Sequence, residues 1–331
     1  MTAKSVQVNG MSSQSPITNP QSAIRNPKFT LHSFAKINWS LEILGRRADG
    51  YHEVRTLLQT ISLHDELYFS PGTYSEVLLS CSDPAIPLGD ENLILRAAKL
   101  LRDRFKITDG AHIHLEKLIP AQGGLGGASS NAAIGLLGLS HLWKIDVLTD
   151  ELHDLASCLG ADVPFFLIGG RALAGGTGTQ VRTADDSELA YLVIVTPNAR
   201  VSTAAAYAAL QAPALTTSSD ATILSISRAE ADLEVSRLCT LRNDFERLVF
   251  ESEPEIERAK TSLVDVGATS SLLSGSGSSV FGVFESKLEQ ERAVKGLKAE
   301  PGWRIFPAVT VSRNEYLQAL GACGLSLSRS A

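Results

Sequence analysis

The chain has 331 residues, a length that predicts about two domains at roughly 150 residues each and leaves ample material for a core. Its 30 Lys and Arg against 36 Asp and Glu give a formal net charge of −6, and this lack of a basic excess argues against a nucleic-acid partner. Hydrophobic residues make up 44% and charged residues 20%, as in an ordinary globular protein, and no apolar run reaches the roughly 20 residues that span a bilayer.

The first 28 residues differ in composition from the rest. Residues 1–28 are rich in Ser, Asn, Gln and Pro, contain no acidic residue and show no hydrophobic periodicity. We expect a disordered tail, because such a segment buries too little apolar surface to fold. It lacks the apolar stretch of a secretory signal. A plastid transit peptide has a similar composition, but only three basic residues precede Phe29, so we favour the tail.

The four cysteines are widely spaced, and none belongs to a Cys-x-x-Cys pair: Cys81, Cys158, Cys239 and Cys323. This spacing indicates neither a zinc site nor a dense disulfide framework. Because disulfides are rare in reducing compartments, we expect a cytoplasmic protein.

Ordered structure is predicted to begin at Phe29, where apolar and polar residues alternate. The alternation over residues 29–43 predicts a long strand or a bent pair of strands. Residues two apart point the same way on a strand, so Lys36 and Asn38 are expected side by side on one face. Asp49-Gly50 is a hairpin signal, and strand character resumes over residues 54–69.

Helical and strand patterns then surround a glycine-rich stretch, residues 120–130. Apolar residues at helical spacing predict a helix over residues 91–105, and alternation predicts a strand over 111–116. A second helix follows the glycines, and a third covers residues 148–159, with Gly160 as its C-terminal stop.

A buried strand at residues 191–195 looks like the start of a second domain. The patterns after it predict a surface connection at 212–219, a helix at 243–264, strand–turn–strand at 271–284, a helix at 288–297 and a strand at 303–311. The mixture of hairpins and helices favours an α+β fold over a doubly wound sheet. We divide the chain into the tail (1–28) and two domains (29–188 and 189–331).

The glycine-rich stretch is the strongest chemical signal. A strand, a glycine-rich loop and a helix place free backbone N–H groups around an anion at the positive end of the helix dipole. The stretch lacks the Lys-Ser/Thr pair of a P-loop, and Ser129 stands at the third glycine position of a dinucleotide fingerprint. The alternative is a flexible loop with a serine helix cap.

Two further glycine clusters are weaker signals. Residues 175–178 and 275–278 are both compatible with plain turns, and the second lies between two apolar strands. The functional alternative for the second cluster is that it lies against the phosphates of a bound nucleotide.

Single polar residues leave their roles open. Asp162 precedes Pro164 and is either a helix N-cap or a carboxylate that handles a proton at a domain cleft. Lys36 by itself is most simply a solvated strand residue. His112 and His114 share a strand face, but no third metal ligand accompanies them. Residues 243–246 are most simply the capped start of a helix.

Three stretches in fixed order resemble the motifs of the GHMP kinases: Phe34-Ala35-Lys36-Ile37-Asn38, the glycine loop with Asn131-Ala132-Ala133, and residues 273–279. Four others resemble the branch of that superfamily that phosphorylates a cytidine diphosphate-linked methylerythritol: residues 47–52, 125–131, 159–165 and 242–244. The resemblance spans about residues 29–311. Gln122 and Ala128 depart from the family's usual small residue and glycine.

The resemblance implies a two-domain ATP-dependent kinase with its active site in the cleft between domains, a small-molecule substrate and Mg²⁺ as cofactor. Asp162 and Lys36 match the catalytic aspartate and lysine. The positions that match the ATP loop are Pro120, Ala121, Gln122, Gly123, Gly124, Leu125, Gly126, Gly127, Ala128, Ser129 and Ser130. Asn38, Tyr51 and His52 match substrate-pocket positions, and Thr203 and Tyr207 align loosely with the segment that closes over the cytidine.

Three alternative functions fit the sequence less well than this kinase activity. A GHMP kinase for mevalonate or homoserine would share the glycine loop but not Ala48-Asp49-Gly50-Tyr51-His52. A non-catalytic nucleotide-binding regulator would lack Lys36 or Asp162, and both are present. A dinucleotide oxidoreductase needs a glycine fingerprint that is absent. The sequence leaves the oligomeric state and the protein ligands of Mg²⁺ open.

Overall fold

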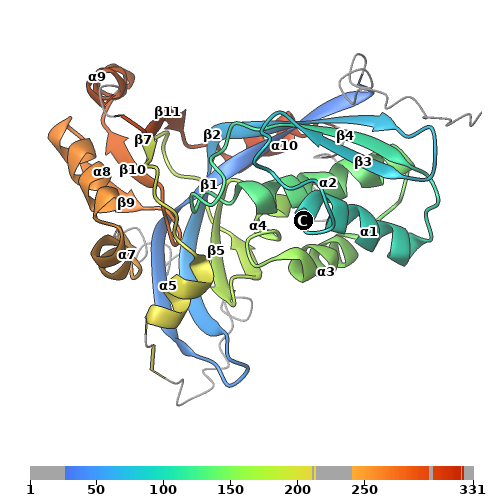
Figure 1. Cartoon of the computed structure of the whole chain (residues 1–331), viewed down its shortest axis with the longest axis horizontal. Coiled ribbons are helices and arrows are strands. Elements are labelled where there is room, and N and C mark those ends of the chain that lie inside the picture. The colour runs from blue at the N-terminus through green and yellow to red at the C-terminus, as the bar shows by residue number, and fades with distance from the viewer. Residues whose placement is uncertain (1–26, 211, 214–240, 298–300, 322, 324–331) are drawn as a thin grey trace, which may run out of the picture.

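A computed structural model describes residues 27–210, 212–213, 241–297, 301–321 and 323. Residues 1–26 of the expected tail and 214–219 of the expected connection lie outside this description. The described chain forms a seven-stranded and a four-stranded sheet with helices packed on both, which confirms the predicted α+β class (Figure 1).

The larger sheet is built on two long antiparallel strands, β1 (Phe29–Arg46) and β2 (His52–Pro71), joined by the predicted Asp-Gly turn. Its strand order is β3-β4-β2-β1-β8, and β5, which pairs with β6, lies against the other end of β2. The shorter strands are β3 (Val77–Cys81), β4 (Ala111–Glu116), β5 (Arg171–Gly176), β6 (Gln180–Thr183) and β8 (Arg242–Asn243).

Helices α1 (Leu93–Phe105), α2 (Gly127–Trp143) and α3 (Thr149–Leu159) pack together beside this sheet, followed by the short α4 (Phe165–Ile168) (Figure 1). Asn92 caps α1, because its side chain accepts a hydrogen bond from the Ile94 amide. Gly160 ends α3 as predicted. The predicted turn at residues 175–178 joins β5 to β6.

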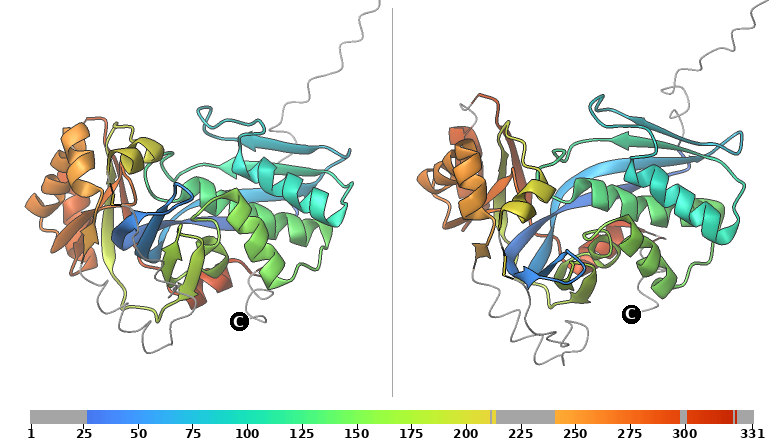
Figure 2. Two further views of the ribbon diagram at one scale, coloured as in Figure 1. Left: turned by 90° about the horizontal axis from the view of Figure 1, so that it is seen from below. Right: turned by 60° about the horizontal axis from the view of Figure 1, so that its bottom comes forward.

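The smaller sheet is antiparallel, in the order β11-β7-β10-β9. Figures 1 and 2 show α7, α8 and α9 at the end of the molecule opposite α1 to α3. The elements are β7 (Tyr191–Thr196), α5 (Thr203–Ala209), α7 (Glu246–Ser252), α8 (Pro254–Asp265), β9 (Ser270–Leu273), β10 (Val280–Phe284), α9 (Lys287–Leu297) and β11 (Arg304–Val309).

The prediction of a single helix over residues 243–264 is wrong. The structure has two helices, α7 and α8, with Glu253 between them. Pro254 occupies the first turn of α8, where a missing N–H costs no hydrogen bond, whereas inside a continuous helix it would remove one.

Several elements have no counterpart in the sequence predictions: β3, α4, β5, β6, α5, β8 and the last helix, α10 (Arg313–Ala319). Ser312 and Glu315 form a capping box at the start of α10. Tyr316 is fully buried in the core that also holds Phe34 and Phe166, and its hydroxyl donates to the Phe166 carbonyl. The chain therefore returns to its first core after completing the second sheet. The division at residue 188 stays a prediction.

A layer of apolar side chains joins the two sheets. Ala35 and Ile37 of β1 pack with Ile194 of β7 and Phe281 of β10. We call the larger sheet with α1 to α4 the first half of the molecule, and the smaller sheet with α5 and α7 to α9 the second half. The long strand β1 packs against both halves, which is why it is buried on both faces over much of its length. No helix in the described part of the chain is long and apolar enough to cross a membrane.

Candidate active site

A cavity of about 530 Å³ lies where the two halves meet. The first half contributes Lys36, Asp162 and the glycine loop to its lining, and the second half contributes Thr203, Tyr207 and Gly275. Residues far apart in the chain therefore share one space, which fits the cleft that the resemblance implies.

Lys36 is buried, with 3% of its surface exposed, so its interpretation as a solvated strand residue is wrong. Its Nζ donates to Asn38 Oδ1 at 2.7 Å and lies 3.5 Å from Asp162 Oδ2. Asn38 Nδ2 in turn donates to Thr56 Oγ1 at 2.7 Å, and Thr56 donates to the Ser40 carbonyl at 2.5 Å. This chain of hydrogen bonds fixes the direction of the ammonium group.

Asp162 lies between α3 and α4 and faces the cavity, with 38% of its side chain exposed. Helix capping does not account for it, because α4 begins after Pro164 and has no side-chain cap hydrogen bond. Its close charged neighbour is the Lys36 ammonium. The carboxylate is thus both open to a ligand and held next to a buried positive charge.

The glycine loop bends through left-handed backbone at Gly124 (φ 72°) and Gly126 (φ 71°). Gly126 is the N-cap of α2, so the loop ends at the positive end of that helix. Residues 120–129 all line the cavity. The predicted arrangement of loop amides and helix N-terminus around one space is therefore present.

The second half of the molecule holds this loop in place. Ser274 Oγ donates to the Gly124 carbonyl at 3.0 Å, and the Ser279 amide donates to the Gly123 carbonyl at 3.1 Å. A Cβ on Gly124 would lie 2.0 Å from the Ser274 carbonyl oxygen. The cluster at 275–278 is thus a β9–β10 turn, and Gly275 and Ser276 also line the cavity.

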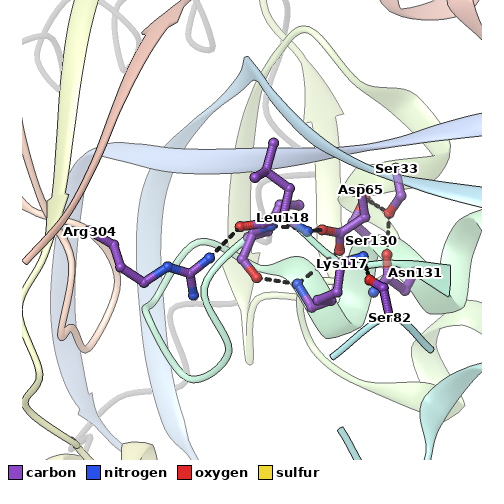
Figure 3. A network of polar contacts seen from close by, with 9 residues as sticks. Ser33, Asp65, Ser82, Lys117, Leu118, Ser130, Asn131 and Arg304 are labelled. Atoms are coloured by element: carbon purple, nitrogen blue, oxygen red, sulfur yellow. Dashed lines mark hydrogen bonds and ion pairs between the residues drawn. The ribbon is translucent and has the colours of Figure 1, made fainter. Parts of the chain in front are cut away.

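The two serines at the end of the loop point in different directions. Ser129 lines the cavity. Ser130 is fully buried, with its hydroxyl 2.8 Å from Ser33 Oγ, which also donates to Asn131 Oδ1 at 2.6 Å (Figure 3). Of the two serines that match the ATP loop, only Ser129 lines the cavity.

Asn243 has a role that the sequence did not indicate. Its Nδ2 donates to the carbonyls of Leu273 (2.8 Å) and Gly275 (2.7 Å), and its Oδ1 accepts from the Phe245 amide. It therefore fixes the turn that supports the glycine loop. The interpretation of residues 243–246 as a capped helix start is wrong, because α7 begins at Glu246 without a side-chain cap. The only sequence signal for this role was that residues 242–244 resemble a motif of the kinase family.

Aromatic rings form one end of the cavity. Tyr207 packs edge-on against Phe245, with ring centroids 4.9 Å apart, and both line the cavity. The ring of His52 lies 5.0 Å from that of Tyr207, tilted by 32°, but His52 is not part of the lining. Tyr51 is 66% exposed and is not part of the lining either.

Helix α5 brings Thr203 and Tyr207 to the cavity. Burial, with the Asp162 carboxylate as a second cause, raises the pKa of Tyr207 to about 12, so its phenol stays protonated at neutral pH. Thr203 Oγ1 lies 2.8 Å from Ser276 Oγ. The loosely aligned α5 segment therefore does reach the cavity.

Sequence analysis also missed a buried ion pair at the entry to the glycine loop, whose lysine, Lys117, lines the cavity (Figure 3). Lys117 Nζ donates to Asp65 Oδ2 at 2.9 Å and to the Ile119 carbonyl. The amides of Leu118 and Ile119 both donate to Asp65 Oδ1 at 2.7 Å. Burial lowers the pKa of Lys117, and the Asp65 carboxylate opposes that shift. The pair therefore fixes residues 117–119, which connect β4 to the glycine loop.

Two family models match the chain. The one described as "GHMP kinases N terminal domain" matches residues 92–170, and the one described as "GHMP kinases C terminal" matches residues 228–301. The first match covers the glycine loop and Asp162, and the second covers the β9–β10 turn.

Relatives and solved structures agree with these matches. A 4-diphosphocytidyl-2-C-methyl-D-erythritol kinase of Prosthecochloris aestuarii is 41% identical over 280 residues, which are 84% of this chain and 97% of the relative. A crystal structure of 4-(cytidine 5'-diphospho)-2C-methyl-D-erythritol kinase matches with a TM-score of 0.69 at 34% identity, covering 85% of this chain and 99% of that one. A homoserine kinase from Cytophaga hutchinsonii shares the fold (TM-score 0.61, 19% identity, 87% and 96% covered).

These findings confirm the two-domain GHMP kinase fold that the motifs implied. The homoserine kinase, at 19% identity, shows the fold alone, whereas the other two matches extend over nearly the whole relative at 34% and 41% identity. On that evidence, this chain belongs to the 4-diphosphocytidyl-2-C-methyl-D-erythritol kinase family of the GHMP kinases.

Proposed function

We propose that the chain transfers the γ-phosphoryl group of ATP to the 2-hydroxyl of 4-diphosphocytidyl-2-C-methyl-D-erythritol. The observation that carries the proposal is the Lys36–Asp162 pair, 3.5 Å apart, in one cavity with the glycine loop. Phosphoryl transfer needs alignment and charge stabilisation rather than covalent help from the protein, and these are what such a cavity supplies.

The nucleotide phosphates bind at the glycine loop. Its amides and the N-terminus of α2 supply donors and a positive dipole, and Ser129 adds a hydroxyl. Glycines at 124 and 126 let the backbone approach the phosphates closely.

Asp162 orients the acceptor hydroxyl and takes its proton, and Lys36 stabilises the charge that develops on the transferring oxygens. The geometry supports this division of labour, because the carboxylate is the more exposed partner and the ammonium is fixed behind it by Asn38.

The cytosine base stacks on the aromatic end of the cavity. Tyr207 offers a ring surface there, with the buried Phe245 packed edge-on against it and the His52 ring 5.0 Å away. Thr203 and Asn38 are the nearby polar groups for the rest of the substrate. An acceptor without a base, such as mevalonate or homoserine, would leave this surface unused.

Mg²⁺ fits the oxygen donors of the cavity. The ion prefers carboxylate, hydroxyl and phosphate oxygens, and Asp162 and Ser129 present the first two. When bound with ATP, it neutralises charge on the phosphoryl group being transferred.

ADP release from Mg·ATP tests the proposal with three acceptors in parallel: diphosphocytidyl-methylerythritol, mevalonate and homoserine. We expect turnover with the first alone. Turnover with mevalonate or homoserine instead would assign the chain to another GHMP activity. ATP binding without turnover of any acceptor would indicate a non-catalytic regulator.

The Gly124→Ala substitution should raise the KM for ATP about 10-fold or more, equivalent to about 1.4 kcal/mol of binding. Its Cβ would overlap the Ser274 carbonyl oxygen, so the loop must move to admit it. Gly267→Ala is the matched control, since it has φ 100° with no atom within 4 Å of its Cβ. The control should lose about 1–2 kcal/mol of stability and keep its KM. Equal KM values in both variants would argue against a phosphate-binding loop.

A further inference from the structure

Two histidines and a glutamate cluster on the larger sheet, outside the lining of the kinase cavity. A ring nitrogen of His32, a ring nitrogen of His64 and a carboxylate oxygen of Glu66 all lie within 4.8 Å of one another. His32 Nε2 is 3.8 Å from Glu66 Oε1, and the two imidazoles stack at a centroid distance of 4.4 Å. Within the described residues, no other group of three or more potential ligands meets this spacing.

Strand pairing brings these three side chains together. His32 of β1 stands directly opposite Glu66 of β2, and His64 is diagonal to His32 because it pairs with Phe34. The next pair is Ala35 with Ile61, so Ser62 and Leu63 are extra residues in β2. Such a bulge redirects neighbouring side chains, and here it lies beside the ring of His64.

Hydrogen bonds prepare two of the three groups as ligands. His64 Nδ1 lies 2.8 Å from the Ser62 carbonyl, which can only accept, so the neutral ring carries its proton on Nδ1 and leaves Nε2 free. The Tyr68 hydroxyl donates to Glu66 Oε2, and Oε1 stays on the His32 side. In metal sites, a ligating histidine commonly donates its other N–H to a carbonyl, and a ligating carboxylate commonly accepts a further hydrogen bond. The Ser62 carbonyl and the Tyr68 hydroxyl are therefore outer partners of the kind that metal ligands have.

The third ligand, His32, is half-buried, with 41% of its side chain exposed. Its Nε2 faces Glu66 Oε1, so an ion placed between them can contact both groups.

We propose that His32, His64 and Glu66 bind a divalent transition-metal ion of the zinc type, with water in the fourth position. Two imidazoles and a carboxylate are a known zinc ligand set, whereas Mg²⁺ prefers oxygen ligands alone. Zinc at about 2.0–2.1 Å from each ligand needs ligand atoms about 3.4 Å apart, close to the 3.8 Å between His32 and Glu66. The site is separate from the kinase cavity and does not depend on the proposed function.

The bound ion would tie β1 to β2 at the bulge, shortly before Lys36 in the chain. A ligand that binds the folded state alone raises its stability. We therefore expect Zn²⁺ to raise the melting temperature of the full chain after treatment with a chelator, and millimolar Mg²⁺ to leave it unchanged.

Titration calorimetry with Zn²⁺ on the chelator-treated full chain tests the assignment. His64→Gln and Glu66→Gln should each weaken binding by at least about 100-fold, and Tyr68→Phe by about 10-fold, as for loss of an outer partner. His112→Gln is the matched control, a histidine of the same sheet outside the cluster, and should bind as the unmodified chain does. No binding by the unmodified chain, or equal binding by all variants, would overturn the proposal.

Two measurements on the unmodified chain cover the case in which a variant misfolds. Zn²⁺ should protect His32 and His64, but not His112, from diethylpyrocarbonate, as mapped by mass spectrometry. Substituted Co²⁺ should give a visible spectrum without a thiolate charge-transfer band, although Cys81, Cys158 and Cys323 are free thiols. A thiolate band, or protection spread over all histidines, would place the metal elsewhere and refute the site.

Discussion

Replacing Asp162 with Asn is expected to lower kcat by about 10²–10⁴-fold, the usual effect of losing a positioned general base. That factor corresponds to roughly 3–5 kcal/mol of barrier. Asn keeps the size and polarity of the side chain but loses the charge that faces Lys36. No helix cap is lost, because α4 has no side-chain cap, so any fall in the melting temperature reports the loss of the charge beside the buried Lys36 ammonium. The KM for ATP should change little, because the glycine loop holds the phosphates.

Lys36→Met tests the partner of Asp162. Met retains the length of the aliphatic stem but cannot donate to Asn38 or face the carboxylate. We expect a similar fall in kcat, and a double variant little worse than either single one, since residues that act as a unit are not additive.

Asp154→Asn, an exposed position in α3, is the matched control and should retain full activity. Steady-state kinetics and thermal melts on these variants separate the roles. A normal kcat in Asp162→Asn would remove Asp162 from the catalytic assignment, whatever the other variants do.

Breaking the buried pair of Asp65 and Lys117 is expected to lower the free energy of unfolding by about 3–5 kcal/mol. Asp65 is fully buried, and Lys117 has 5% of its side chain exposed. Lys117→Met leaves the Asp65 carboxylate without a countercharge, and Asp65→Leu also removes the acceptor of the Leu118 and Ile119 amides. An uncompensated buried charge is costly because the interior solvates it poorly.

Denaturant unfolding of both single variants and the double variant measures this effect. The double variant should be less destabilised than the sum of the single ones, because it leaves no charge unpaired. Arg104→Met removes an ion pair to Glu151 whose arginine is 59% exposed, and this control should cost no more than about 1 kcal/mol. Losses near 1 kcal/mol at Lys117 would mean that water reaches the pair and that it does not hold the entry to the glycine loop.

Local patterns predicted most of the secondary structure because they act over a few residues. Period-two alternation predicted β1, and helical spacing before and after the glycines predicted α1 and α3. The failures have local causes too: Pro254 divides the helix predicted at 243–264, and the five residues of β3 are too few for a clear pattern.

Local sequence patterns predicted the glycine loop of the candidate site but not the roles of Asp162 and Ser130. The glycine loop carries its own signal, since its backbone conformation needs glycine at positions 124 and 126. Asp162 and Ser130 carry no such signal: an aspartate before a proline is more often a cap, and adjacent serines look alike until a helix sets their directions. The motif resemblance, not the spacing of residues, selected Asp162 and Lys36.

The sequence by itself determined the α+β class, the loop–helix junction that suits an anion, and membership in the GHMP kinases, because each rests on short motifs or local patterns. Tertiary structure alone decided that Lys36 lies 3.5 Å from Asp162, that Asn243 supports the glycine loop from the other half, and that His32 meets His64 and Glu66 across a bulge. These meetings depend on strand register and on packing between the two sheets. Both are set by the summed burial of many distant side chains, so no short segment encodes them.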